Sequence, residues 1–207
     1  MINVITNKAV NNFMAGLRDK STTPADFRNY LESISLGLAF EMSNSISTKQ
    51  IKVSTPLEET SCEVFDGELV LLPILRAGLG MLPPFSKIFP AAKVEYQVLQ
   101  RDEATYGISS YYTSYKSFNS NSKIFILDPM IATGNTLCSA IETLRINGAT
   151  DINIASIIAA PQGIENVLTL FPNVNIWTCA LDRDLNSNSY ILPGLGDAGD
   201  RMNGCQP

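Results

Sequence analysis

Five apolar segments limit the folds open to this chain more than any other feature. A strand with one face in water alternates apolar and polar residues, whereas several of these segments are apolar throughout. Such strands need cover on both faces, as in a parallel sheet between two layers of helices. The predicted strands are residues 68–75 (ELVLLPIL), 93–99 (KVEYQVL), 123–127 (KIFIL), 152–159 (INIASIIA) and 174–181 (VNIWTCAL).

Segments with helical features lie between and before these strands. Residues 135–146 carry apolar side chains on one face and end before Gly148, and residues 163–170 follow Pro161. Near the amino terminus, Thr23 and Pro24 form a helix start, and apolar residues then recur at spacings of three and four. The alternation of strands and helices predicts an α/β fold with a mostly parallel central sheet flanked by helices, of the Rossmann-like three-layer type.

Composition excludes several classes of function. The sequence contains no histidine, which excludes Ser-His-Asp and Cys-His catalysis. A net charge of −5 argues against nucleic acid as a partner. The four cysteines form no Cys-x-x-Cys pair, which fits a reducing compartment and gives no zinc signature. No apolar run approaches the roughly 20 residues of a membrane-spanning helix, so we expect a cytoplasmic protein without a membrane partner.

The first candidate site follows the predicted strand at 123–127. Asp128 stands at the carboxyl end of this strand, where ligands bind in parallel sheets, and residues 132–136 (ATGNT) lead into the next helix. Unpaired N–H groups at a helix start favour a phosphate, and Thr133 and Thr136 add hydroxyl donors. No lysine follows Gly134, so this is not the nucleoside-triphosphate P-loop. We interpret the segment as a phosphate loop, with Asp128 placed to hold ribose hydroxyls; an ordinary turn is the alternative.

A second candidate is Arg76, which follows a predicted strand and precedes Gly78 and Gly80. A guanidinium at a strand end beside small residues can bind a phosphate or a carboxylate through two parallel hydrogen bonds. Pairing with a surface acid is the alternative, and from the residues alone it is the simpler interpretation.

The third candidate is the glycine-rich segment at 190–201 (YILPGLGDAGDR). It contains Gly194-x-Gly196-x-x-Gly199, the letters of the dinucleotide fingerprint. That fingerprint has to open a helix inside a strand-helix-strand unit, and only eight residues follow Gly199. We therefore reject a dinucleotide site and expect a rigid loop whose backbone contacts a flat ligand; a structured tail is the alternative.

Taken together, three segments resemble the uracil phosphoribosyltransferases, a branch of the type I phosphoribosyltransferases. They are PILRAGLGM (73–81), DPMIATGNT (128–136) and YILPGLGDAGDR (190–201), with further similarity in AAPQGI (159–164) and in the pattern Leu17-Arg18…Thr23…Phe27-Arg28. The resemblance covers almost the whole chain. It implies a single domain over 1–207, with a helical segment at 1–50, a core at about 60–180, a flexible β-arm or flap and a C-terminal uracil-binding hood at 182–207. Residues 106–122 are polar and aromatic without helical period, which predicts a hairpin arm or this flap, although residues 106–118 match the family pattern poorly.

The resemblance implies a reaction in which uracil and 5-phospho-α-D-ribose 1-diphosphate (PRPP) give uridine monophosphate (UMP) and diphosphate, in pyrimidine salvage. It implies Mg²⁺ bound mainly through the diphosphate of PRPP, with no residue assigned as a direct metal ligand. It also implies a homodimer or higher homo-oligomer and, as in some relatives, guanosine triphosphate (GTP) as an allosteric effector.

Residue roles follow from the same resemblance. Arg76, Arg101, Asp128 and Asp197 are expected to be catalytic, Arg101 contacting the diphosphate from the flap. The expected PRPP-binding residues are Arg76, Arg101, Asp128, Pro129, Met130, Ile131, Ala132, Thr133, Gly134, Asn135, Thr136 and Asp197. Uracil is expected to contact Ile191, Gly196, Asp197 and Ala198, largely through main-chain groups.

The sequence departs from the family pattern at three positions. Asn135 stands where most relatives have a second glycine, Gln100 where a tyrosine is usual, and Asn203 where a phenylalanine is usual. Asparagine tolerates left-handed backbone better than most residues, so the loop around Asn135 can keep its shape. Two alternatives remain beside the enzyme: a regulatory protein that binds PRPP without turnover, and a transferase that acts on another base.

Overall fold

A parallel sheet forms the centre of the molecule in the computed structural model, which describes residues 1–101 and 108–205. The strands lie in the order β1, β11, β10, β8, β4 and β5, with β9 also paired to β10, and all these pairs are parallel. The predicted sheet is confirmed, although the predicted strand at 93–99 divides. The strands are β1 (Ile2–Val4), β4 (Glu68–Pro73), β5 (Lys93–Val94), β8 (Ser122–Leu127), β9 (Met130–Ile131), β10 (Asp151–Ala159) and β11 (Asn175–Leu181).

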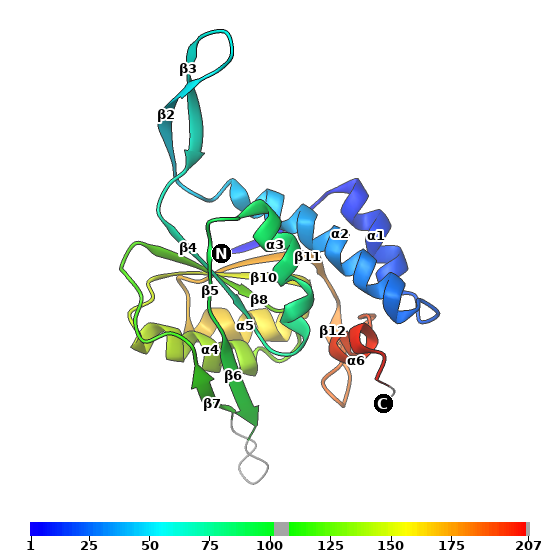
Figure 1. Cartoon of the computed structure of the whole chain (residues 1–207). Helices are drawn as coiled ribbons and strands as arrows, with labels where there is room; N and C mark the ends of the chain where they lie inside the picture. The colour runs from blue at the N-terminus through cyan, green and yellow to red at the C-terminus, as the bar shows by residue number, and fades with distance from the viewer. Residues whose placement is uncertain (102–107, 206–207) are drawn as a thin grey trace.

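Helices cover both faces of this sheet (Figure 1). One layer consists of α1 (Lys8–Arg18), α2 (Pro24–Ser43) and α3 (Leu82–Ile88), and the other consists of α4 (Asn135–Ile146) and α5 (Pro161–Leu170). The bounds of α4 are those predicted, and α5 begins at Pro161, two residues before its predicted start. The Thr23 hydroxyl caps α2 by accepting a hydrogen bond from the Asp26 N–H at 3.2 Å.

Successive strand residues pack into opposite halves of the core, which explains the unbroken apolar runs. In β8, Phe125 and Leu127 join the cluster beneath α1, α2 and α3, whereas Ile124 and Ile126 join the cluster beneath α4 and α5. All four side chains are fully buried. Burial of such a side chain stabilises the fold by about 1.5–3 kcal/mol, so a polar residue on either face would be costly.

Two hairpins extend from the layered body (Figure 1). The first, β2 (Thr48–Ser54) with β3 (Glu59–Phe65), was not predicted, and nearly all its side chains are exposed. The second pairs β6 (Gln97–Arg101) with β7 (Ile108–Thr113). β7 lies within the segment expected to form an arm or flap, whereas β6 begins inside the strand predicted at 93–99. None of the helices within residues 1–101 and 108–205 combines the length and apolar character needed to cross a membrane.

The chain ends in short elements beside the α2 layer. A two-stranded ladder joins β12 (Asp184–Leu185) to β13 (Ile191–Leu192), and α6 (Ala198–Asn203) follows. The amide of Asn203 donates to the Gly199 carbonyl at 2.8 Å, so this departure from the family pattern is accommodated within α6.

Candidate active site

Asp128 lies where β8 ends, at the carboxyl edge of the sheet. Its backbone N–H donates to the Ala155 carbonyl at 3.1 Å, and its Oδ1 accepts from the Met130 N–H at 3.3 Å. The side chain is partly exposed toward a small cavity of about 80 Å³. Desolvation raises the pKa of Asp128 to about 7, although the Met130 N–H opposes this shift. The cavity is lined by Asp128, Met130, Ile131, Ala132, Thr133, Gly134, Thr136 and Leu137.

The loop after Asp128 is pinned to the end of the sheet. Pro129 is buried, and its carbonyl accepts hydrogen bonds from the N–H groups of Ile157 and Ile158, both at 3.1 Å. The Ile131 carbonyl accepts from the Ala160 N–H at 2.8 Å. These bonds fix the direction in which the backbone leaves β8, so the loop is held in shape without a ligand.

Two glycines let α5 approach this loop closely. Gly134 has a φ of +79°, and a Cβ there would lie 2.7 Å from the Gly163 carbonyl oxygen. A Cβ on Gly163 would lie 2.3 Å from the Ala132 carbonyl oxygen. Side chains at either position would therefore push the loop and α5 apart. Gly134 precedes α4 and, as its N-cap residue, has no side chain to cap the helix. The Asn135 N–H makes a long contact of 3.5 Å with the Thr133 Oγ1, which a ligand at this helix start could replace.

Asn166 of α5 connects both sides of the same loop. Its amide nitrogen donates to the Thr133 carbonyl at 2.9 Å and to the Asn135 Oδ1 at 2.9 Å. A glycine at position 135 would have no oxygen to accept this second bond. Asn135, which departs from the family pattern, is thus integrated into the loop by a partner that sequence reasoning did not identify.

Arg76 lies on the neighbouring turn at the same edge of the sheet, where the Leu75–Arg76 peptide bond is cis. Its side chain is 69% exposed, and its Nη2 contacts the Asp200 Oδ1 at 3.4 Å. The 3₁₀ turn η1 (Ala77–Gly80) that follows is pressed against β8, because a Cβ on Gly78 would lie only 2.2 Å from the Leu127 carbonyl oxygen. The Arg76 turn and Asp128 are therefore adjacent.

The glycine-rich segment also lies at this edge of the sheet, next to η1. Gly196 has a φ of +79°, and Asp197 caps α6 by accepting from the Asp200 N–H at 2.9 Å. An ideal Cβ on Gly199 would lie 3.9 Å from the Ala77 Cβ, which places α6 beside η1. Two of the predicted uracil contacts, Ile191 and Ala198, are buried, so their side chains belong to the core.

The structure thus gathers the three predicted segments at one edge of the sheet, but not all predicted residues can be placed. The 80 Å³ cavity is lined by residues 128–137 alone among those described, so the hood does not line it. Arg101 ends β6, and its side chain lies outside the described part of the chain, as does that of Gln100. The predicted flap at 106–118 falls partly on the undescribed residues 102–107.

Two arginines and an aspartate near the hood were not predicted as functional. Arg18 pairs with Asp182, and Arg201 binds carbonyl groups at the end of α1. The sequence did contain a sign that Asp182 could be functional, because Asp182 directly follows β11, the last strand of the central sheet, as Asp128 follows β8. Arg18 stood inside a pattern used for the family resemblance, yet its partner lies 164 residues away, which no local pattern indicates.

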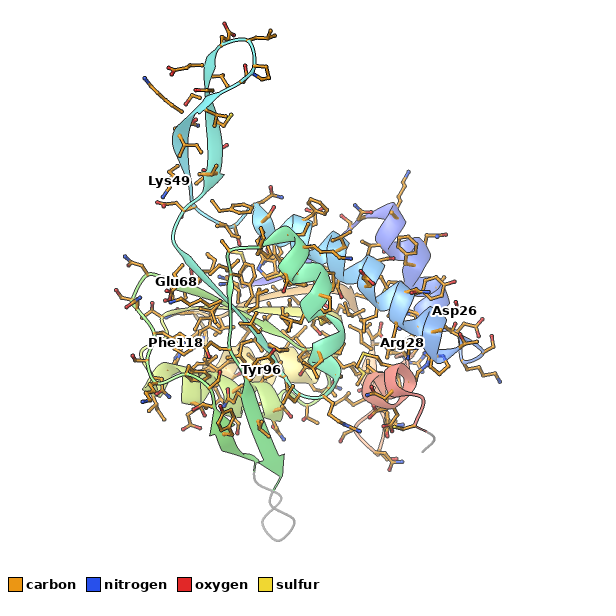
Figure 2. All side chains as sticks on the ribbon, viewed as in Figure 1. Asp26, Arg28, Lys49, Glu68, Tyr96 and Phe118 are labelled. Atoms are coloured by element: carbon orange, nitrogen blue, oxygen red, sulfur yellow. The ribbon has the colours of Figure 1, made fainter. Side chains whose placement is uncertain are left out.

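A larger cavity of about 620 Å³ lies at the opposite edge of the sheet, near the base of the β2–β3 hairpin. Figure 2 labels Lys49 and Glu68 in this region. Its charges are paired: Lys123 contacts Asp151 at 2.7 Å, Lys49 contacts Asp66 at 2.9 Å, and Lys93 contacts Glu68. None of the predicted site residues lines it, so the chemistry expected from the sequence belongs to the carboxyl edge.

Comparison with known proteins agrees with this geometry. A family model described as uracil phosphoribosyltransferase matches residues 4–205. The uracil phosphoribosyltransferase of Thermosipho melanesiensis is 41% identical over 202 residues, covering 97% of each chain. The AQ2163 protein from Aquifex aeolicus has a TM-score of 0.90 at 30% identity, covering 98% of this chain and 97% of that one.

A more distant solved structure shares the fold alone. It is the adenine phosphoribosyl transferase from Trypanosoma brucei in complex with AMP, pyrophosphate and ribose-5-phosphate. Its TM-score is 0.60 at 13% identity, and the match covers 87% of this chain and 83% of that one.

Proposed function

The chain belongs to the uracil phosphoribosyltransferase family, and we propose that the carboxyl edge of its sheet binds PRPP while the hood binds uracil. It is a pentosyltransferase that converts uracil and PRPP to UMP and diphosphate. Uracil N1 bonds to the anomeric carbon and loses its proton, and the bond from that carbon to diphosphate breaks. Family membership does not favour the alternative of a regulatory protein without turnover.

The loop at 128–136 is the proposed site of the 5-phosphate and ribose. The N–H groups at the start of α4 and the hydroxyls of Thr133 and Thr136 would hold the phosphate. The Asp128 carboxylate would accept hydrogen bonds from the ribose hydroxyls. The preformed backbone supports this proposal, because a loop that is already ordered loses little entropy when PRPP binds.

Diphosphate would be held by guanidinium groups. Arg76 is well exposed on the turn next to the end of β8, and it is free to exchange its long contact with Asp200 for a leaving diphosphate. Arg101 is proposed to approach from the β6–β7 hairpin. Stabilising negative charge as it develops on the leaving group is the main task of such a site, because the anomeric carbon passes through an oxocarbenium-like state.

Uracil would be recognised by main-chain groups at Ile191, Gly196, Asp197 and Ala198. Uracil presents two carbonyl acceptors and one ring N–H donor to such a surface. Cytosine carries an amine where uracil has a carbonyl, so one buried pair would fail and cytosine would be rejected. Discrimination by fixed backbone groups requires that the hood keep one conformation.

Mg²⁺ is proposed to bind mainly through the oxygens of PRPP. The described residues contain no cluster of three or more acidic or thiol side chains for a metal. Carboxylate oxygen is nevertheless the donor that Mg²⁺ prefers, and Asp128 and Asp197 offer it at this edge. When bound, the ion would neutralise charge on the diphosphate. Arg76 would contribute to the same neutralisation from the protein.

One observation carries the assignment of the site: Asp128, the Arg76 turn and the hood meet at one edge of the sheet. The experiment is to incubate the purified protein with radiolabelled uracil, PRPP and Mg²⁺ and to measure labelled UMP. Cytosine, thymine and hypoxanthine in place of uracil test the choice of base. UMP formed at no more than the rate without protein would contradict the proposal.

Self-association and an effector are further proposals. The β2–β3 hairpin carries exposed apolar side chains, including Leu57 at 95% and Phe65 at 46%, and isolated two-stranded hairpins are marginally stable in water. Contact with a second copy of the chain would bury it. Sedimentation of the protein and of Leu57→Asp would test a homodimer or larger oligomer, and initial rates with and without GTP would test activation.

A further inference from the structure

The end of α1 is bonded to the hood through Arg18 and Asp182. The Arg18 guanidinium donates two hydrogen bonds to the Asp182 carboxylate, Nη1 to Oδ2 at 2.8 Å and Nη2 to Oδ1 at 2.6 Å. Nη1 also donates to the Gly194 carbonyl at 2.7 Å, and the Gly194 N–H donates to Asp182 Oδ2 at 2.9 Å. This pair therefore binds both backbone groups of Gly194.

The ion pair is partly buried and is connected to the sheet. The side chain of Asp182 is 4% exposed and that of Arg18 is 24% exposed. Asp182 follows β11, and its N–H donates to the Ala159 carbonyl at the end of β10 at 2.8 Å. Through Asp182, Gly194 is thus held in a fixed position relative to the sheet edge that carries Asp128. A charge-assisted, two-pronged pair of this kind fixes orientation as well as distance.

Arg201 makes a second connection in the opposite direction. From α6, its guanidinium donates to the Leu17 carbonyl at 2.6 Å, to the Leu195 carbonyl at 2.7 Å and to the Asp19 carbonyl. It also lies 4.6 Å from the centre of the Phe27 ring. Two of its carbonyl partners belong to the end of α1, and the third is the residue after Gly194.

Both sets of hydrogen bonds hold residues that directly precede residues 196–198, whose backbone is proposed to bind uracil. Gly194 and Leu195 are fixed, and Gly196, Asp197 and Ala198 follow in the chain. The left-handed backbone at Gly194 and Gly196, with φ of +66° and +79°, has few alternatives once residues on both sides are held. Arg28 adds a bond to the Met202 carbonyl at 2.7 Å from α2, near α6 (Figure 2). The hood is therefore held from outside its own sequence.

We propose that Arg18, Asp182 and Arg201 are positioning residues that set uracil affinity and base selectivity by fixing the backbone of residues 194–198. The inference rests on the proposed role of the hood as the uracil site. None of the three residues has to contact substrate. The main alternative is a purely stabilising tie between the termini, and it makes a different prediction, because lost stability alone would leave the KM for uracil unchanged in the folded fraction.

The test compares Arg18→Met, Arg18→Lys and Asp182→Asn with the parent protein. Loss of charge-assisted bonds of this kind is expected to raise the KM for uracil by about tenfold or more in Arg18→Met and Asp182→Asn. Arg18→Lys keeps the positive charge but cannot make the two parallel hydrogen bonds of a guanidinium, so a smaller rise in the KM for uracil is expected. The KM for PRPP should rise clearly less than the KM for uracil, because the loop proposed for its phosphate and ribose is held by other residues and Asp197 is the hood residue expected to contact PRPP. The rate with thymine relative to uracil should rise.

A matched control and a binding measurement separate the outcomes. Lys87→Met breaks the exposed Lys87–Glu32 pair between α3 and α2, away from the hood, and should leave both KM values unchanged. Calorimetric titration with PRPP and with UMP reports the two halves of the site without turnover. UMP binding that is weakened more than PRPP binding supports the proposal, and Arg18→Lys, the mildest of the three variants, can report this difference if the others do not fold.

Two results would overturn the inference. One is a uracil KM within twofold of the parent value in folded Arg18→Met or Asp182→Asn. The other is a PRPP KM that rises as much as the uracil KM. By contrast, absence of UMP formation by the unmodified protein would contradict the proposed function itself, and the calorimetric titrations would still report on the hood.

Discussion

Replacement of Asp128 by asparagine should stabilise the ligand-free protein at pH 8 while removing most of its activity. In the folded state desolvation raises the pKa of this carboxyl from its ordinary 3.8 to about 7. The folded protein therefore binds more protons than the unfolded chain between these values, so stability falls as pH rises through this range. The loss is complete above about pH 7. Asparagine has no proton to lose and escapes this penalty.

The expected magnitude follows from the same shift. A difference of about three pH units corresponds to at most about 4 kcal/mol at 1.36 kcal/mol per unit. Because the Asp128 side chain is partly exposed, solvent screening reduces this to about 2 kcal/mol. For a chain of this size, such a gain raises the melting temperature by about 4–8 °C at pH 8. At pH 5 the gain should be less than half as large.

Thermal and urea unfolding of the two proteins at pH 5 and pH 8 would measure the difference. Glu142→Gln, which removes one exposed carboxylate on α4, is the control for the change in net charge. Activity would be followed as UMP formation, which should fall by orders of magnitude in Asp128→Asn. A variant no more stable than the parent at pH 8, or one whose advantage is the same at both pH values, would refute the reasoning.

Three further outcomes are expected. Arg76→Ala should lower turnover by about 10²–10³-fold with an unchanged circular dichroism spectrum, because it removes the positive charge that stabilises the leaving diphosphate. Near-normal kinetics would reject the proposed role of Arg76. Asn166→Ala should raise the KM for PRPP several-fold, since it frees the Thr133 carbonyl and Asn135, and should leave that for uracil unchanged. In the parent protein, kcat/KM for PRPP should increase through about pH 7 as Asp128 ionises; a flat profile would exclude its carboxylate.

Most of the layered core could be predicted because its strands are continuous apolar runs covered on both faces. The prediction of α4 was accurate because its apolar face, the glycine before its start and Gly148 after its end all indicate the same helix. The β2–β3 hairpin was missed because its residues are mostly exposed and polar. Without a buried face, the segment shows no alternation of apolar and polar residues. α1 lies within the helical segment that the family resemblance implies at 1–50, although no separate helix was predicted from the helical spacing of Val10, Met14 and Leu17. β1 is too short to produce a periodicity.

The site was predictable to the extent that its residues follow strand ends. Asp128 and Arg76 were singled out as candidates from that position, although pairing with a surface acid was the simpler interpretation of Arg76, and the structure pairs it with Asp200. The family resemblance supplied the expected roles of Arg76 and of the hood. The Arg18–Asp182 pair could not be found, because two ordinary charged residues far apart in sequence meet only after the sheet has formed. Asn166 was equally hidden, since it acts on the phosphate loop from the neighbouring helix.

A crystal structure of the protein with UMP would test the two-part site most directly. We predict the phosphate within hydrogen-bonding distance of the N–H groups of residues 133–136, with the ribose beside Asp128. The uracil ring should lie against the backbone of residues 196–198. A nucleotide bound in the 620 Å³ cavity at the opposite edge of the sheet, or a base turned away from the hood, would contradict the account.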